Sequence, residues 1–425
     1  MTHPVTDASH PAGPAPSAVA VLADDLTSAG DGAAPFRAAG HEARLLLCDP
    51  PSFAAQVFPP LGTGVTALDL GTRVLDEAQA AHRTGEAAGA LAAADLLVKT
   101  VDSTLRGHLA SEVRAAWAGS GRRAVVLAPA FPAEGRVTVG GVQFVRGVPV
   151  HESEFARDPV HPVTCSDLSL LFPDAVLVGP DRLAGLPQLI DEGGLFVCCA
   201  VRDEDLDALV ASVTEPEAVL WVGSPGLAAA LARRRIRTPA ATPPTLTPAL
   251  RPLVVVGSAN PSSLRQLDLL HDRSGADGAT VTADPGQAVT ALRRMTTSVR
   301  TLRMPAARHD PATARILARS LADAACALVE SSDADALVLT GGETAVTVLT
   351  ALGAAGIRLV DEPEPGVARG LLTGLGGTRG PDTVPVLIKA GGFGDDGTLL
   401  RLAEIAAHPH GRRGSTDAAD RGGRR

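Results

Sequence analysis

Three acids in the segment VLADDLTSAGD (21–31) have the type and spacing expected at a ligand-binding edge of a sheet. Asp24 and Asp25 directly follow a predicted strand, and α/β folds bind ligands at the carboxyl ends of their strands. Helix capping is the alternative, since aspartate and threonine are favoured N-cap residues. Capping by Asp25 or Thr27 needs one acid and does not explain Asp24, Asp25 and Asp31 together. We therefore favour a functional interpretation.

A second segment, VKTVDSTLRGH (98–108), brings basic and hydroxyl side chains into a short loop between a predicted strand and a helix. Lys99 ends the strand, and Asp102 and Arg106 follow with a serine and a threonine between them. A lysine and the fork of an arginine beside hydroxyl groups suit a substrate that carries both a carboxylate and hydroxyls. A capped helix start with an exposed arginine explains the segment equally well, so both interpretations stay open on these residues alone.

Three apolar runs in the C-terminal half end in glycine turns: LVVVGSANPSS (253–263), LVLTGGET (337–344) and VLIKAGGFGD (386–395). Glycine lets main-chain N–H groups approach an anion closely, and α/β proteins bind phosphates at such turns. The chain contains no GxxxxGK[ST] and no GxGxxG. Tight turns for packing would explain each turn separately. Together they predict a nucleotide-phosphate site.

A long irregular segment lies between these two groups of motifs, APAFPAEGRVTVGG (128–141) and then HESEFARDPVHPV (151–163). Irregular segments of this length are often functional lids. The intervening VQFVRGVPV (142–150) predicts a β-hairpin that turns at Arg146–Gly147. A structural ion pair is the simplest interpretation of three charged residues here: Glu154, Arg157 and Asp158.

Length and composition indicate a globular protein. Its 425 residues favour two domains, and 45% hydrophobic residues with only 3% aromatics predict an aliphatic core. A net charge of −9 argues against nucleic acid as the main partner. No run of 18 apolar residues predicts a membrane span, and the N-terminus lacks a signal-peptide pattern. The five cysteines form no CxxC, which favours a reducing cytoplasm.

Apolar runs alternate with Ala- and Leu-rich helical stretches along the whole chain, which predicts parallel sheets covered by helices. The fold class expected is α/β with two domains, each a mostly parallel sheet covered by helices. Five prolines interrupt the alternation in IRTPAATPPTLTPALRP (236–252), the best domain boundary. The expected organisation is: a disordered leader at 1–17, an N-terminal domain at 18–235, a linker at 236–252, a C-terminal domain at 253–410 and a disordered tail at 411–425. The expected strands are 18–23, 44–48, 65–69, 95–99, 124–128, 176–178, 195–199, 219–222, 253–256, 279–282, 336–340, 357–360 and 385–389.

Taken together, these motifs resemble the four-carbon acid sugar kinase family, which includes 3-oxo-tetronate, D-threonate and D-erythronate kinases. The resemblance runs from about residue 18 to about residue 407. The matching segments, in order, are ADDLTSAGD (23–31), KTVDSTLRGH (99–108), PAFPAEGRVTVGG (129–141), EFARDPVHPV (154–163), VVVGSANPSS (254–263), TGGET (340–344), EPGVARG (364–370) and KAGGFGD (389–395).

The resemblance implies an ATP-dependent kinase whose N-terminal domain binds the sugar acid, whose C-terminal domain binds ATP and whose active site lies in the cleft between them. By position, the sugar-acid site would be lined by Asp24, Asp25, Lys99, Asp102 and Arg106. The nucleotide site would be lined by Ser258, Gly341, Gly342, Glu343, Thr344 and Gly391. An acid from Asp24 or Asp25 would orient or deprotonate the attacking hydroxyl, and Mg²⁺ would accompany ATP.

Two departures from the family pattern leave the particular four-carbon acid open. Ser28 stands where the family usually has glycine, and His108 where it usually has asparagine. The expected partners are a small sugar acid and ATP, without nucleic acid or membrane, and a homodimer is compatible. A non-catalytic sensor of sugar acids or nucleotides is the main alternative. A dehydrogenase is weakened by the missing GxGxxG.

Overall fold

The computed structural model describes residues 18–48, 61–158, 161–235, 244–257, 260–307, 309–375 and 384–409. The expected leader and tail lie outside these ranges, as do the first part of the proline-rich segment (236–243) and Ser258.

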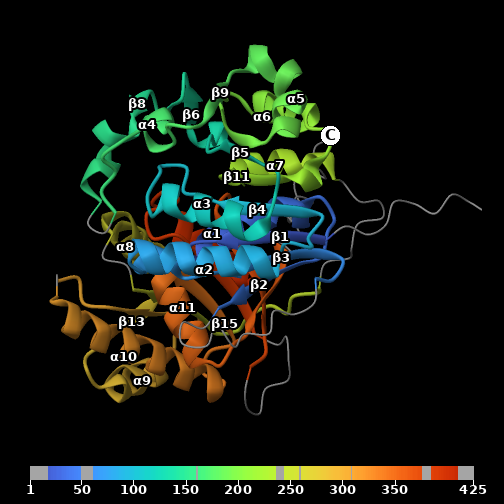
Figure 1. The fold of residues 1–425 in the computed structure, drawn as a ribbon. Coiled ribbons are helices and arrows are strands. Elements are labelled where there is room, and N and C mark those ends of the chain that lie inside the picture. Colours follow the sequence, from blue (N-terminus) through green and yellow to red (C-terminus); the bar gives the residue numbers. More distant parts are fainter. Residues whose placement is uncertain are drawn as a thin grey trace, which may run out of the picture.

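Within the described residues, fifteen strands form one mixed sheet that runs through both halves of the chain (Figure 1). The strands of the N-terminal half are β1 (Ala18–Ala23), β2 (Ala43–Leu47), β3 (Gly64–Asp69), β4 (Leu96–Thr100), β5 (Ala124–Ala128), β9 (Val176–Val178), β10 (Gly194–Cys198) and β11 (Val219–Gly223). Those of the C-terminal half are β12 (Pro252–Val256), β13 (Asp277–Thr280), β14 (Arg300–Arg303), β15 (Ala336–Thr340), β16 (Gly356–Asp361), β17 (Val367–Thr373) and β18 (Pro385–Lys389). Their order across the sheet is β13-β14-β12-β15-β18-β17-β16-β2-β3-β1-β4-β11-β5-β10-β9.

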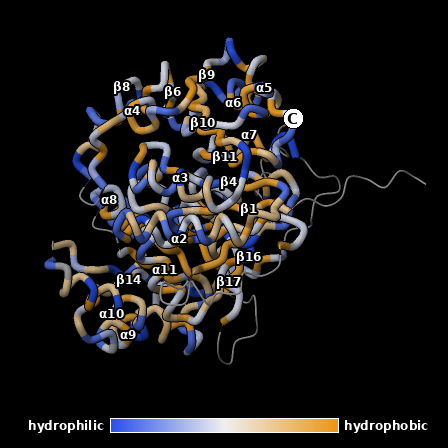
Figure 2. The backbone as a smooth tube through the Cα atoms, in the orientation of Figure 1, coloured by the Kyte–Doolittle hydropathy of each residue, from blue (hydrophilic) through white to orange (hydrophobic). Residues whose placement is uncertain are grey.

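Helices cover both faces of this sheet, as the strand–helix alternation predicts. They are α1 (Leu26–Ala38), α2 (Glu77–Ala90), α3 (Leu109–Ser120), α4 (Leu168–Leu171), α5 (Leu186–Glu192), α6 (Asp203–Ser212), α7 (Pro225–Arg234), α8 (Pro261–Ser274), α9 (Pro285–Arg294), α10 (Pro311–Glu330), α11 (Gly342–Ala351) and α12 (Thr398–Ala407). The strands β1, β4, β11, β12 and β15 are buried and mainly apolar, and Figure 2 maps the hydropathy along the backbone. No helix in the ranges given above is long and apolar enough to cross a bilayer.

The predicted strands agree with the structure at most positions. The segments 18–23, 124–128, 176–178, 336–340 and 385–389 match their strands at both ends. The hairpin is also confirmed. β7 (Val142–Val145) pairs antiparallel with β6 (Arg136–Val139) and with β8 (Val148–Pro149). Arg146 and Gly147 both have positive φ, at 50° and 82°, as a type I′ turn requires.

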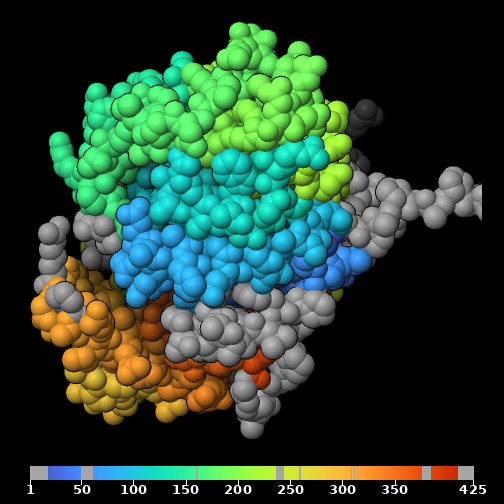
Figure 3. Space-filling model, viewed as in Figure 1, coloured from blue at the N-terminus to red at the C-terminus, as the bar shows by residue number. Residues whose placement is uncertain are grey.

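The expectation of a separate sheet in each domain is wrong. β2 of the N-terminal half pairs antiparallel with β16 of the C-terminal half, in the register Leu45↔Ile357 and Arg44↔Arg358. Without this pairing each strand would expose a row of unpaired N–H and C=O groups along one edge. Hydrophobic patterns identify strands but not their neighbours, so the junction was not predicted. The two halves consequently lie directly against each other (Figure 3).

Helix α1 packs across this junction, against β2 and β3 of its own half and against β16 and β17 of the other. The contact is close enough to require glycine. A Cβ placed on Gly30 would lie 2.9 Å from the Cβ of Ala368 in β17. Since α1 begins at the predicted acid motif, this packing positions the acids beside the C-terminal half.

The junction can be tested at Gly356, because a Cβ there would lie 2.1 Å from the carbonyl oxygen of Leu45 in β2. We expect Gly356→Ala to lower the free energy of unfolding by roughly 1–3 kcal/mol, since the two strands must separate to admit the methyl group. Chemical denaturation measures this. Gly62→Ala is the matched control, because a Cβ on Gly62 has no neighbour within 4 Å. Equal stability of the two variants would mean that β2 and β16 do not pair in solution.

Candidate active site

The two acids after β1 have different surroundings. Asp25 caps α1, since its Oδ1 accepts hydrogen bonds from the Ser28 N–H at 2.7 Å and from the Thr27 hydroxyl at 2.8 Å. The capping interpretation therefore holds for one oxygen of Asp25. Asp24 is buried and takes no part in the cap.

Arg73, in the 3₁₀ turn Thr72–Val74, binds both acids. Its Nε and Nη2 donate to Oδ2 and Oδ1 of Asp24 at 2.8 and 3.0 Å, and its Nη1 donates to Asp25 Oδ2. Burial alone would raise the pKa of Asp24, but Arg73 and Lys99 outweigh it and hold that pKa below its usual value. Arg73 was missed in the sequence because it lies in no segment with a recognisable pattern. Asp24 and Asp25 thus share one arginine partner.

Lys99 is the predicted site residue whose position differs most from the expectation. Its side chain is 1% exposed, and its Nζ donates to Glu112 Oε2 at 2.8 Å and to the Thr100 carbonyl at 2.8 Å. It therefore has no surface to offer a ligand in this conformation. Its charge still acts on Asp24, so we assign it to the support of the acids.

The loop after β4 holds Asp102 and Arg106 together. Asp102 Oδ2 accepts hydrogen bonds from Arg106 Nε and from the Thr104 hydroxyl, both at 2.5 Å. Burial opposes ionisation of Asp102, but Arg106 and Arg73 lower its pKa well below the usual value. Arg106 also lies 5.3 Å from the ring centroid of Phe155 and 3.4 Å from Asp158 Oδ2. Asp158 thus takes part in an ion pair with an arginine of the candidate site, which the expectation of a structural pair among Glu154, Arg157 and Asp158 did not include.

A cavity of about 70 Å³ lies where these groups meet the C-terminal half, and we call it the arginine cavity after three of its residues, Arg73, Arg106 and Arg136. Its other lining residues are Thr27, Ser28, Asp31, Thr100, Val101, Asp102, Ser103, Phe131, Pro225, Ala390 and Phe393. Ala390 and Phe393 belong to the third glycine turn, so both halves line one cavity. Arg136 Nη1 donates to the Ser103 hydroxyl at 2.5 Å, and burial lowers the arginine's pKa.

Asp31 lines this cavity from α1 and differs from the other acids there. Within the described residues it makes no hydrogen bond or ion pair. Burial raises its pKa well above the usual value, and the negative charges of Glu362 and Asp25 add to the shift. Asp31 is therefore the carboxyl group of the cavity that is poised to take up a proton.

The GGET turn lies beside the acids. Gly341 has φ 99° and precedes α11, and no side chain caps that helix. A Cβ placed on Gly342 would lie 3.5 Å from Asp25 Oδ2. The uncapped N–H groups of Gly342, Glu343 and Thr344 are consequently available to an anion next to the arginine cavity.

The other two glycine turns lie next to the GGET turn. The Gly341 N–H donates to the Lys389 carbonyl at 2.9 Å, and the Ser263 hydroxyl donates to the Gly391 carbonyl at 2.5 Å. A Cβ placed on Gly257 would lie 2.0 Å from the Thr344 hydroxyl oxygen, so the first turn also touches the second. The structure thus brings the predicted nucleotide residues together, apart from Ser258, which lies outside the described ranges.

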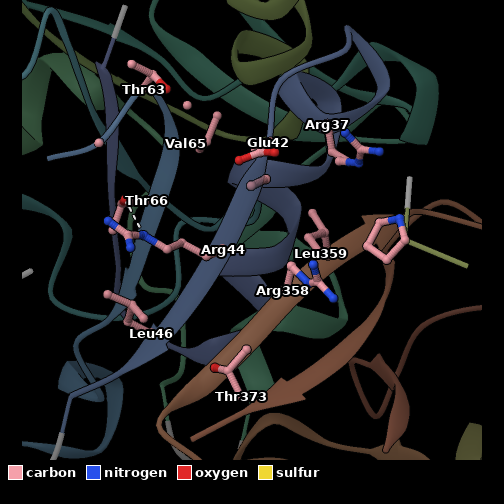
Figure 4. Close-up of a pocket in the computed structure, with 14 residues that line it drawn as sticks. Arg37, Glu42, Arg44, Leu46, Thr63, Val65, Thr66, Arg358, Leu359 and Thr373 are labelled. Carbon is pink, nitrogen blue, oxygen red and sulfur yellow. Dashed lines mark hydrogen bonds between the residues drawn. The ribbon is translucent and has the colours of Figure 1, made fainter. Parts of the chain in front are cut away.

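A larger cavity of about 560 Å³ lies elsewhere, over the β2–β16 junction (Figure 4). Arg44, Thr66 and Arg358 line it, and Arg44 Nε donates to the Thr66 hydroxyl at 3.0 Å. It contains none of the predicted site residues. The chemistry of the lining residues therefore favours the smaller cavity as the active site.

Comparison with known protein families divides the chain into two parts with different ligands. Residues 19–231 match a family described as the sugar-binding N-terminal domain, and residues 253–399 match one described as the nucleotide-binding C-terminal domain. The two matches end and begin on either side of the proline-rich segment. The arginine cavity lies mainly on the first match and the three glycine turns on the second.

Relatives with assigned names extend over most of the chain. A D-threonate kinase of Bordetella bronchiseptica is 35% identical, covering 91% of this chain and 96% of its own length. A D-threonate kinase of Salmonella typhimurium is 30% identical, covering 89% and 96%. A crystal structure of another Salmonella typhimurium protein shares the fold, with a TM-score of 0.72 and 22% identity over 90% of this chain and 98% of that one. On this evidence the chain belongs to the four-carbon acid sugar kinase family.

Proposed function

We propose that this protein transfers the γ-phosphoryl group of ATP to a hydroxyl of a four-carbon acid sugar, with D-threonate as the first candidate. The observation that carries the proposal is the position of the GGET turn, where a Cβ on Gly342 would lie 3.5 Å from Asp25 at the edge of the arginine cavity. A phosphate at the start of α11 and a sugar acid in the cavity would be neighbours. Phosphoryl transfer depends mainly on such positioning and on stabilisation of charge.

The arginine cavity supplies the recognition of a sugar acid. Arg106 is 30% exposed, and its Nη2 makes no hydrogen bond within the described residues. Among the described residues, the side chain of Arg136 donates only through Nη1, to the Ser103 hydroxyl. Guanidinium groups with free N–H donors bind a carboxylate well, and their charge survives partial burial. We assign the substrate carboxylate to Arg106 and Arg136.

The three glycine turns supply the recognition of ATP. The start of α11 carries uncapped N–H groups and the positive end of the helix dipole, both of which favour phosphate. The neighbouring turns adjoin this helix start through Gly257, which lies against Thr344, and through the Lys389 carbonyl, which accepts the Gly341 N–H. The assignment gives the sequence-predicted residues Gly341 to Thr344 a common role.

The contacts of the acids favour a different proton acceptor from the one expected. Arg73 holds both Asp24 and Asp25, and its charge helps to lower the pKa of Asp24, which weakens Asp24 as a base. Asp31 has no partner in the described residues, and its pKa is raised towards the range in which a general base works best. We therefore assign proton acceptance from the substrate hydroxyl to Asp31, and the holding of Arg73 to Asp24 and Asp25.

Few protein ligands would hold Mg²⁺ at this site, as is usual in ATP-dependent kinases. Among the described residues no three His, Cys, Asp or Glu side chains have metal-ligand spacing. Mg²⁺ commonly needs just one or two carboxylates, with phosphate oxygens and water as its other ligands. Glu362 lies close enough to Asp31 to raise its pKa and is the candidate carboxylate. Bound there, the ion would neutralise phosphate charge.

The function is tested directly by ADP release from ATP with a panel of four-carbon acids, including D-threonate, D-erythronate and 3-oxo-tetronates. We expect one of them to be phosphorylated with a clear preference. Binding of a sugar acid or of ATP without turnover of any acid would instead favour a sensor.

Arg106→Ala should weaken binding of the sugar acid and spare ATP. Losing a charge-assisted hydrogen bond to a carboxylate costs about 1.5–3 kcal/mol, or roughly a ten- to 150-fold rise in KM for the acid. Arg114→Ala is a matched control, because Arg114 also pairs with an aspartate (Asp174) and lies over a phenylalanine ring (Phe172), but at the surface. Unchanged KM for the acid in Arg106→Ala would remove Arg106 from the site.

Gly342→Val should have the converse effect. The first added carbon has room, since its nearest neighbours, atoms of Asp25 and Thr27, lie at 3.5 to 3.8 Å, so the fold should tolerate the change. The branched side chain would occupy the space in front of the α11 N–H groups, and we expect KM for ATP to rise about tenfold or more. Steady-state kinetics and a thermal melt measure the two effects. Normal ATP kinetics would make the turn purely structural.

Asp31→Asn should lower kcat by about 10²–10⁴-fold with little change in KM for ATP, as expected for loss of a general base. In the wild type, the rate should rise with pH as the Asp31 carboxyl ionises, and its raised pKa places this limb above the range of an ordinary aspartate. The limb should be absent from Asp31→Asn. Asp76→Asn, at the exposed cap of α2, is the control. If the rate of Asp31→Asn rises with pH in the same range as the rate of Asp76→Asn, the assignment is contradicted.

A further inference from the structure

Two lysines in this fold are buried at the ends of parallel strands, and in the described part of the chain only one of them has an anionic partner. Lys99 at the end of β4 is 1% exposed and pairs with Glu112 at 2.8 Å. Lys389 at the end of β18 is also fully buried, and its Nζ donates to the carbonyls of Ala390 and Gly391 at 2.9 and 3.4 Å. Within the described residues no carboxylate pairs with Lys389. A buried ammonium group without a counter-ion is costly, so this one is unusual.

The charged groups on the elements packed against β18 do not compensate Lys389. β15 has no charged residue. Arg369 of β17 pairs with Asp361, and Arg401 of α12 pairs with Glu364. Glu343 of α11 and Glu404 of α12 are exposed. Burial alone lowers the pKa of Lys389, to about 8, so the protein without ligand leaves this charge unbalanced.

Lys389 also helps to orient the third glycine turn, together with the Ser263 hydroxyl, which donates to the Gly391 carbonyl, and the Phe393 N–H, which donates to the Ala390 carbonyl. In a trans peptide the C=O and the N–H point in opposite directions. Because the carbonyls of Ala390 and Gly391 point at the ammonium group, the N–H groups of Gly391 and Gly392 point away from it. Neither N–H donates a hydrogen bond to a described residue. Two adjacent unpaired N–H groups form the kind of concave site that binds anions.

A second unpaired group lies next to this lysine. Thr340 of β15 is opposite Lys389 in the sheet register and is fully buried. Its hydroxyl has no hydrogen-bond partner in the described structure. The Lys389 carbonyl accepts the Gly341 N–H at 2.9 Å, so the start of α11 adjoins the same place. In the described structure, a cation without an anionic partner and an unpaired hydroxyl therefore lie on neighbouring strands, beside two sets of N–H groups that have no described acceptor.

We propose that Lys389 is a positioning residue for the nucleotide phosphates, which holds the Gly391–Gly392 turn with its N–H groups towards them and supplies the buried charge that they balance. The inference rests on the proposed function, since it takes the bound anion to be the phosphates of ATP. It assigns to Lys389 a role that neither the sugar-acid cavity nor the GGET turn supplies.

The proposal predicts uptake of protons when nucleotide binds. A phosphate next to the turn favours the charged form of Lys389 and raises its pKa, while the free protein at pH 8 holds the group about half protonated. Binding of a non-hydrolysable Mg–ATP analogue at pH 8 should therefore take up roughly half a proton per site, and much less at pH 6.5. Calorimetry in buffers of different ionisation enthalpy measures the uptake.

Two variants separate the role in binding from a role in folding. Lys389→Met keeps the length of the side chain without its charge, and we expect no proton uptake and at least about tenfold weaker binding of the analogue. Lys389→Arg stays charged at pH 8 and should bind nucleotide better than Lys389→Met, again without uptake. Thermal melts should show Lys389→Met as stable as the wild type. Lys99→Met, which leaves Glu112 unpaired, should be less stable.

The outcomes distinguish this inference from the proposed function. If the wild type binds no nucleotide, both the proposed function and the inference about Lys389 fail. If the wild type binds the analogue but Lys389→Met shows the same affinity and the same proton uptake, the function survives and the role of Lys389 is overturned. Weaker binding with unchanged proton uptake would also overturn it, because the titrating group would lie elsewhere.

Discussion

The pairing of β2 with β16 is the interaction on which the rest of this structure depends. It converts two α/β halves into one sheet, and α1 packs over the seam against strands of both. As a result, α1, which begins at the acid motif, and α11, which begins at the GGET turn, start next to each other. One of these helices is capped by its own Asp25, and the other has no cap. The difference leaves one positive helix end free, at the point where a phosphate would complete it.

Around that point the protein alternates acidic and basic side chains so that nearly every buried charge has a partner. Arg73 holds Asp24 and Asp25, Arg106 holds Asp102, and Glu112 holds Lys99. Against this background two groups near the site stand out. Asp31 is held towards its neutral form by its surroundings, and Lys389 is a buried cation with no carboxylate partner among the described residues. Perturbed and unpaired groups of this kind concentrate at functional sites, because a ligand supplies what the protein omits.

The sequence was sufficient for the fold class, most strands, the hairpin and the motifs that meet at the site. These features depend on local pattern, since an apolar run followed by glycine or acids is visible in a single segment. Two strands in which an arginine interrupts the apolar pattern were missed, β14 (RTLR) and β17 (VARGLLT). Arg73 could not be found either, because nothing in the sequence around it indicates that its side chain reaches Asp24. The buried state of Lys99 depends on Glu112, thirteen residues later on another element.

The pairing of β2 with β16 also limits how far the two halves can be produced as separate domains. Each half corresponds to a separate family description, which suggests that each could be produced alone. The structure argues otherwise, because cutting the chain in the proline-rich segment would leave β2 and β16 as open edges with unsatisfied backbone groups. Such edges recruit other strands, so isolated halves would tend to aggregate or to pair with a second copy. Independence in sequence therefore does not extend to independent solubility, and the smallest useful unit of this protein is the whole folded chain.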